Sequence, residues 1–345
     1  MAAWCNIDFS NITSNPFGAL SYHKIDFIVN GENLTTFSAP EGITRLKPYV
    51  FYNSPFTSAD LTGITEINDY AMAYCGSLTS VIFDDGLKNI GNGGFYSCKV
   101  LPEINLPEGL ETIGDSAFCG CNQLTTLTIP SSVISVGKEA FKTCNGFTEL
   151  EFTHGIEFGD GCFYGCTGLT TLKIAGGTTI GKECFYKCSG LTDVWFSGPV
   201  SVKTSAFFNC SNLTNLYVSS LEDWMMSDFE SGISASNIYF NNETLTSLLV
   251  PQQCTRIPSY SFANSNMIEE VVCHEGVESI GERAFYSADN LTRVELANVK
   301  EIESNAFYYC SGLSQINLEK VERIGDYAFA YTGIAEVEFN KDAEI

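Results

Sequence analysis

The sequence predicts a solenoid of short strand-and-turn coils, because one unit of 22 or 23 residues recurs through almost the whole chain. Apart from a first step of 21 residues and one of 55, this spacing separates the large apolar residues that we call anchors. The anchors are Phe51, Met72, Phe95, Phe118, Phe141, Phe163, Phe185, Phe207, Phe262, Phe285, Phe307 and Phe329. A unit this short cannot bury its apolar side chains alone, so neighbouring units must stack.

A leucine-rich phrase in each unit supplies the predicted strand. In one copy, Leu127 and Ile129 are expected to point inward, and Thr126 and Thr128 outward, because residues two apart on a strand share a face. Strands stacked about 4.8 Å apart would pair into a parallel sheet on one face of the solenoid. The rest of each unit, which includes an Ile/Val-Gly pair in most copies, predicts turns and short helical or 3-10 segments in a horseshoe or arc.

Cysteines form a column three residues after the anchors. The chain has fourteen cysteines, and eight of them occupy this position: Cys75, Cys98, Cys121, Cys144, Cys166, Cys188, Cys210 and Cys310. Free cysteine is among the most buried residue types. The side chains of stacked units run parallel, which makes the roughly 90° S–S dihedral of a disulfide hard to reach. We therefore expect buried, free thiols and no zinc site, since zinc needs four converging ligands.

The complete phrase resembles a known repeat family. From Ile113 to Pro130 it reads Ile-Gly-x-x-Ala-Phe-x-x-Cys-x-x-Leu-Thr-x-Leu-x-Ile-Pro, and this is similar to the BspA-like branch of the leucine-rich-repeat proteins. The similarity covers nearly the whole chain in some twelve copies. It implies a leucine-rich-repeat solenoid, and a surface or secreted protein that binds host proteins and promotes adhesion or aggregation.

Two inserts divide the predicted solenoid into two modules. The 55-residue step contains Trp224 and Phe229, and the N-terminus has Trp4 and Phe9 at the same spacing. Residues 30–35 also align with residues 241–246. We expect one continuous solenoid over 1–345. Its first module is 1–218, with an insert at 1–40 and repeats at 41–218. Its second module is 219–345, with an insert at 219–250 and repeats at 251–345.

Composition and motifs argue against several functions. Acidic residues outnumber basic ones 41 to 18, and the net charge of −23 disfavours nucleic acid and anionic membranes as partners. No apolar run is long enough to insert into a membrane, and the first residues lack the pattern of a signal peptide. The three histidines, His23, His154 and His274, lie in different units, so no triad and no catalytic residue is expected. No cofactor is expected either.

A candidate binding patch stands out among the outward residues of the predicted strands. Most of these residues are small or polar, but Trp195 and Tyr217 are expected on adjacent strands, flanked by Lys173, Asp193 and Asn215. Exposed aromatic residues beside polar groups are typical of binding hot spots. We predict that these five residues form the contact patch. The alternative is an aromatic pair that only stabilises the sheet.

The sequence thus favours a non-catalytic binding or adhesion module that recognises a protein or a glycan through the outward face of its sheet. The alternative is a structural or assembly component of a phage or a cell-surface complex. Such a component would use the sheet and its uncapped ends for end-to-end or homo-oligomeric contacts, because neither the N-terminal insert nor the tail at Asn340–Ile345 is an obvious cap. A carbohydrate-active enzyme ranks third.

Overall fold

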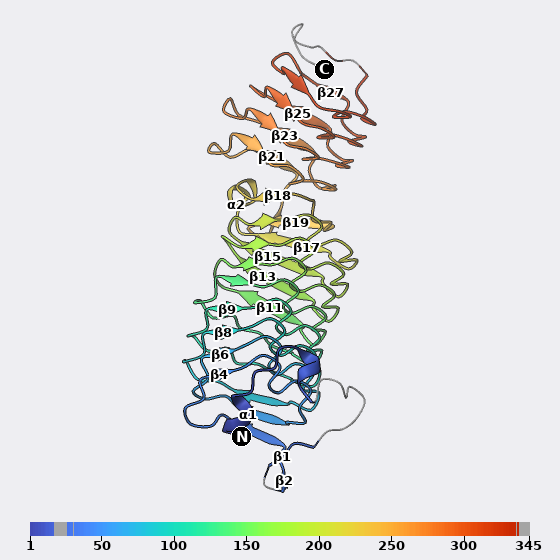
Figure 1. Cartoon of the computed structure of the whole chain (residues 1–345). Helices are drawn as coiled ribbons and strands as arrows, with labels where there is room; N and C mark the ends of the chain where they lie inside the picture. The colour runs from blue at the N-terminus through green and yellow to red at the C-terminus, as the bar shows by residue number, and fades with distance from the viewer. Residues whose placement is uncertain (17–25, 30, 336, 338–345) are drawn as a thin grey trace. The chain divides into compact units, whose positions relative to one another are not determined.

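The computed structural model describes residues 1–16, 26–29, 31–335 and 337 (Figure 1). His23, Asn30 and the tail at Asn340–Ile345 lie outside these residues. The chain forms two units. The first contains Met1–Leu172, Ile180–Leu191 and Asn209–Ser211, and the second contains Lys173–Thr179, Thr192–Phe208 and Asn212–Ile345. Each unit is a parallel-sheet solenoid, which confirms the predicted fold class.

The first unit has two ladders of short parallel strands. The leucine-rich phrases form β3 (Thr36–Ser38), β5 (Ser58–Asp60), β7 (Ser80–Ile82) and β11 (Glu149–Phe152). The residues around the Ile/Val-Gly pairs form a second ladder, in the order β4 (Arg45–Leu46), β6 (Glu66–Ile67), β8 (Asn89–Ile90), β9 (Thr112–Ile113), β10 (Ser135–Val136) and β12 (Glu157–Phe158). The sequence predicted only the first of these ladders. β13 (Thr171–Ala175) and β14 (Thr179–Ile180) have residues in both units.

Two leucine-rich phrases of the first unit form no strand. Leu127 and Ile129 are buried, and Thr126 and Thr128 are exposed, so the predicted alternation is confirmed. The phrase itself is not hydrogen-bonded as a strand, and neither is the preceding one at 101–107. That preceding phrase contains Pro102 and Pro107, which have no N–H group to donate to a ladder.

The second unit has the same two kinds of ladder. Its leucine-rich strands are β15 (Asp193–Ser197), β17 (Asn215–Val218) and β19 (Asn237–Phe240), followed by β21 (Ser247–Leu249), β23 (Glu270–Val272), β25 (Arg293–Glu295) and β27 (Gln315–Ile316). Its short strands are β16 (Ser201–Val202), β18 (Asp228–Phe229), β22 (Arg256–Ile257), β24 (Ser279–Ile280), β26 (Glu301–Ile302) and β28 (Arg323–Ile324).

Both ladders continue from the repeats into the second insert and end within it. β18 pairs with β16, and β19 pairs with β17, both in parallel. The chain then folds back as β20 (Glu243–Thr244), which is antiparallel to β19, and a new sheet begins at β21. The first insert ends in a matching antiparallel hairpin of β1 (Ile28–Val29) and β2 (Glu32–Asn33). The predicted module boundary at 218/219 therefore falls within a continuous pair of ladders.

The anchors lie in turns rather than helices. The residues two before and two after each anchor adopt positive φ, as do Ser116 (54°) and Gly120 (77°) around Phe118. An α-helix needs consecutive right-handed residues, so this alternation excludes one. Helices among the described residues are confined to α1 (Ala2–Cys5), α2 (Leu221–Met225) and the 3-10 turn η1 (Ile12–Ser14).

Stacked anchor rings form the centre of the core. From Phe95 to Phe185, successive anchor rings lie 5.2 to 5.4 Å apart with nearly parallel planes. The rings of Phe285, Phe307 and Phe329 repeat this arrangement at 5.3 Å. Parallel stacking follows from the repeat itself, because identical side chains occupy identical positions in successive coils.

The cysteine column is buried and hydrogen-bonded. All fourteen cysteines are free and buried, as predicted. In addition, each thiol of the column donates to the backbone carbonyl of the anchor one coil earlier, as Cys121 Sγ does to Phe95 O at 3.2 Å. Burial raises the pKa of Cys210 and of Cys310 to about 12, so these thiols stay protonated and unreactive.

The two inserts cover the first coil that follows each of them. In interior coils, each anchor donates its backbone N–H to the carbonyl of the residue just before the next anchor. Phe95, for example, donates to Ala117 O at 2.8 Å. In the coils of Phe51 and Phe262, which follow the two inserts, this carbonyl accepts an indole N–H instead: Trp4 donates to Val50 O at 2.8 Å, and Trp224 donates to Ser261 O at 2.9 Å. The described part of the N-terminal insert therefore covers the first coil in the same way as the second insert covers the coil of Phe262.

Candidate binding surface

The predicted aromatic pair is part of a longer ladder in the second unit. Trp195, Tyr217 and Tyr239 lie in register on β15, β17 and β19. The rings of Trp195 and Tyr217 stack at 4.4 Å and 9°, and those of Tyr217 and Tyr239 at 5.0 Å and 15°. Inward neighbours such as Val194 and Leu216 fix the strands in the core, because they are completely buried. We call the three stacked residues the aromatic ladder.

A row of polar side chains runs beside the aromatic ladder, two residues earlier on each strand. Asn237 Nδ2 donates to Asn215 Oδ1 at 3.0 Å, and Asn215 Nδ2 donates to Asp193 Oδ1 at 2.8 Å. The hydroxyl of Thr192 donates to the other carboxylate oxygen of Asp193 at 2.6 Å. Hydrogen bonds in such a chain polarise one another, so Asp193 orients both amides. We call Asp193, Asn215 and Asn237 the amide row.

Stacking decides what the aromatic ladder presents to a ligand. Both faces of the Tyr217 ring are covered by its neighbours, so mainly ring edges and polar tips remain for a ligand. The three residues are half-buried, whereas Asn105 and Thr128 at the same position in the first unit are exposed. The pKa of Tyr217 is raised, chiefly by partial burial and to a smaller extent by the negative charge of Asp193 and by the neighbouring Tyr239. The Tyr217 hydroxyl therefore stays protonated and can both donate and accept.

The five predicted residues lie on three neighbouring strands of one sheet, β13, β15 and β17. Asp193, Trp195, Asn215 and Tyr217 lie together on β15 and β17 as predicted. Lys173 is half-buried on β13, the neighbour of β15 in the sheet. The sequence prediction missed Asn237 and Tyr239, which complete the amide row and the aromatic ladder. The signal was present, because Asn237-Ile238-Tyr239-Phe240 repeats Asn215-Leu216-Tyr217-Val218 after 22 residues.

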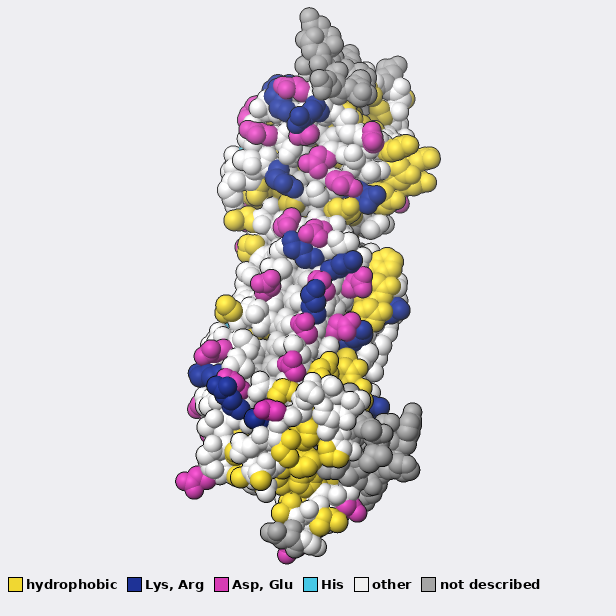
Figure 2. All heavy atoms as spheres, viewed as in Figure 1, with side chains coloured by type: hydrophobic (Ala, Val, Ile, Leu, Met, Phe, Trp, Pro, Cys, Tyr) yellow, Lys and Arg dark blue, Asp and Glu magenta, His cyan; other side chains and the backbone are white. Residues whose placement is uncertain are grey.

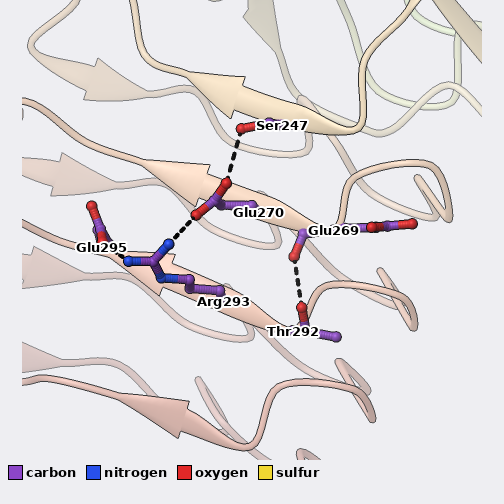
Figure 3. A network of polar contacts seen from close by, with 6 residues as sticks. All are labelled: Ser247, Glu269, Glu270, Thr292, Arg293 and Glu295. Atoms are coloured by element: carbon purple, nitrogen blue, oxygen red, sulfur yellow. Dashed lines mark hydrogen bonds and ion pairs between the residues drawn. The ribbon is translucent and has the colours of Figure 1, made fainter.

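Charged residues occupy the same outward positions on the later strands of this unit. Figure 3 shows Arg293 of β25 between Glu270 and Glu295, with an ion pair of 2.6 Å to Glu270. Ser247 of β21 donates to Glu270 at 3.2 Å. We call Glu270, Arg293 and Glu295 the charged network. Figure 2 shows acidic and basic side chains interleaved over the visible face of the molecule, which is typical of a solubilising surface.

The described histidines make structural contacts. His154 Nε2 lies 3.0 Å from Val133 O, and His274 Nε2 lies 3.0 Å from Pro251 O. Gly276 donates its N–H to His274 Nδ1, so Nε2 of this ring is the donor. Over the residues that the structure describes, no three His, Cys, Asp or Glu side chains are grouped to hold a metal ion. No helix in that part of the chain is long and apolar enough to cross a membrane.

Comparison with known sequences identifies the repeat. The profile described as BspA type leucine rich repeat region (6 copies) matches residues 26–148, 111–232 and 233–345. The chain belongs to this family. No curated protein sequence matches it.

A solved structure shares the fold of this BspA-type chain. A leucine-rich repeat protein from Bacteroides ovatus has 21% identity and a TM-score of 0.52, over 90% of this chain and 82% of that protein. A leucine rich cell surface protein from Faecalibacterium prausnitzii has 22% identity and a TM-score of 0.43, over 90% and 88%. Leucine-rich-repeat solenoids of this kind are binding or scaffold folds, not folds associated with catalysis.

Proposed function

We propose that this BspA-type chain is a non-catalytic binding module that recognises a protein partner through the aromatic ladder and the amide row. The observation that carries the proposal is the rigid stack of Trp195, Tyr217 and Tyr239 on the outward face of the sheet. Tryptophan and tyrosine are enriched among residues that dominate binding energy. Here their side chains are already fixed by stacking, so little conformational entropy is lost when a partner binds.

The same geometry supports a protein rather than a glycan. Sugar rings pack on the electron-rich faces of aromatic side chains. In the aromatic ladder, Tyr217 has no open face, because Trp195 and Tyr239 lie on its two sides. Ring edges next to amide groups suit the mixed apolar and polar surface of a protein.

A binding screen with matched variants tests the proposal. The intact chain and two triple variants would be passed over arrays of immobilised extracellular matrix proteins and of glycans. One variant is Trp195→Ser/Tyr217→Ser/Tyr239→Ser. The control variant, Glu270→Gln/Arg293→Gln/Glu295→Gln, changes outward residues of β23 and β25 instead.

The expected result is a protein ligand whose affinity falls at least about 30-fold in the aromatic-ladder variant, as for loss of roughly 2 kcal/mol at a hot spot. The control variant should bind as the natural chain does. Equal binding by both variants would move the site elsewhere. Binding to glycans alone would overturn the assignment of a protein partner.

A further inference from the structure

We propose that the aromatic ladder and the amide row bind an extended peptide segment of the partner, with its main chain along the amide row. This inference rests on the proposed function and adds the form of the ligand. It starts from the hydrogen-bonding groups that the amide row leaves available beside an apolar strip.

The amide row retains both donors and acceptors. A primary amide carries two N–H groups, and Asn215 and Asn237 each use one of them within the row. Among the described residues, none donates a hydrogen bond to Asn237 Oδ1. The two side chains can therefore offer further N–H groups and a carbonyl oxygen. A peptide main chain has the complementary pair, one N–H and one C=O per residue.

The surroundings of the amide row favour the main chain over charged side chains. Along β15, β17 and β19, Asp193 is the one acidic side chain of the row, and its two carboxyl oxygens already accept from Asn215 and Thr192. A partner that relied on ion pairs would find few charges here. Neutral peptide groups can form hydrogen bonds with the oriented amides, and no ion pair is needed for this.

The dimensions fit a short extended segment. From Asp193 to Asn237 the row crosses two strand spacings, about 10 Å in all. An extended chain advances about 3.3 Å per residue, so about three residues would span the row. Side chains of such a segment would lie against the ring edges of Trp195, Tyr217 and Tyr239, which run parallel to the row.

Selection from a library of random 12-residue peptides displayed on phage tests the inference with the intact chain. Affinities of the selected synthetic peptides are then measured by fluorescence anisotropy. The key variant is Asn215→Leu/Asn237→Leu, which removes the amides but keeps the shape. The matched control is Ser247→Ala/Gln315→Leu, at the same outward position on β21 and β27. Circular dichroism establishes that each variant is folded.

The expected result is a set of peptides that lose at least about 10-fold in affinity with the Asn variant and keep it with the control. N-methylation of a central peptide bond should weaken binding to a similar degree, because it removes a main-chain donor. Peptides that bind the Asn variant normally, or that tolerate N-methylation at every position, would overturn the inference. So would a folded ligand that needs the aromatic ladder while no peptide is selected, although the proposed function would then stand.

Discussion

The strands β15, β17 and β19 and the strands β23, β25 and β27 carry outward side chains at the same positions, but these side chains interact differently. The first group holds the aromatic ladder, whose rings are fixed by contact with one another. The second holds the charged network, in which the side chain of Arg293 remains 63% exposed. Exposed ion pairs contribute little to stability and are screened by salt, whereas ring stacking is not. The repeat thus supplies one scaffold, and the outward residues determine which part of it is preorganised for binding.

Replacing Trp224 should have the largest effect on stability. The side chain packs against the inner side of β15 and also bonds to the coil just before β23, where the charged network begins. Its ring is 6.2 Å from Phe196, which is in β15, and its N–H bonds to Ser261. Trp224→Ala should cost about 3–5 kcal/mol. Trp224→Phe keeps a ring and loses the hydrogen bond, at about 1–3 kcal/mol for an unsatisfied carbonyl.

Hydrogen exchange would show where these losses fall. Exchange in Trp224→Ala should accelerate in β15–β19 and around Ser261, but in Trp224→Phe mainly around Ser261. Trp4→Phe is the matched control, because Trp4 makes the equivalent bond to Val50 in the first unit. Unchanged exchange around Ser261 in Trp224→Phe would contradict the capping role.

Coupling energies should separate the two regions next. A double-mutant cycle between Trp195 and Tyr217 should give about 0.5–1.5 kcal/mol, nearly independent of salt. The cycle between Glu270 and Arg293 should give about 0.2–1 kcal/mol and decrease in 1 M NaCl. Urea unfolding of each variant at two salt concentrations provides the values. A Trp195–Tyr217 coupling that vanished in salt would erase the distinction between the regions.

The smallest expected effect is on the titration of Tyr217. Its folded-state pKa is raised, so the neutral phenol is favoured in the folded chain. Its contribution to stability is present below the unfolded pKa of about 10 and is lost as pH rises through the folded pKa. Asp193→Asn removes a cause of the shift and should lower the pKa of Tyr217. NMR of ring-labelled tyrosine measures this, and Glu295→Gln should leave that pKa unchanged.

Periodicity was sufficient to predict the coils, because a column such as the anchors repeats one side chain in one environment. The stacked anchors and the buried cysteines follow from that spacing. The hydrogen bonds from the thiols to the anchor carbonyls could not be predicted. They depend on turns that contain residues with positive φ, such as Ser116, and a serine in the sequence does not indicate positive φ. Trp4 and Trp224 were recognised as equivalent, but their bonds join residues 46 and 37 positions apart, which no local pattern reveals.

The candidate surface was predicted in part for a related reason. Trp195 and Tyr217 are unusual for their column, so they were found. Tyr239 lies in the 55-residue step between two anchors, which the sequence analysis treated as an insert. The strand ladder nevertheless continues through this segment. We propose that the chain behaves as the two modules 1–218 and 219–345. The paired indole hydrogen bonds support it, whereas the ladders continue past residue 218 and the new sheet begins only at β21.

Hydroxyl-radical footprinting of the intact chain with its bound protein ligand tests the central claim most directly, because tryptophan and tyrosine side chains react readily with the radical. Binding should reduce the modification of Trp195, Tyr217 and Tyr239 and leave that of exposed Tyr309 and Tyr331 unchanged. Protection of Tyr309 and Tyr331, with none at the aromatic ladder, would contradict the claim that the outward face of β15, β17 and β19 is the binding surface.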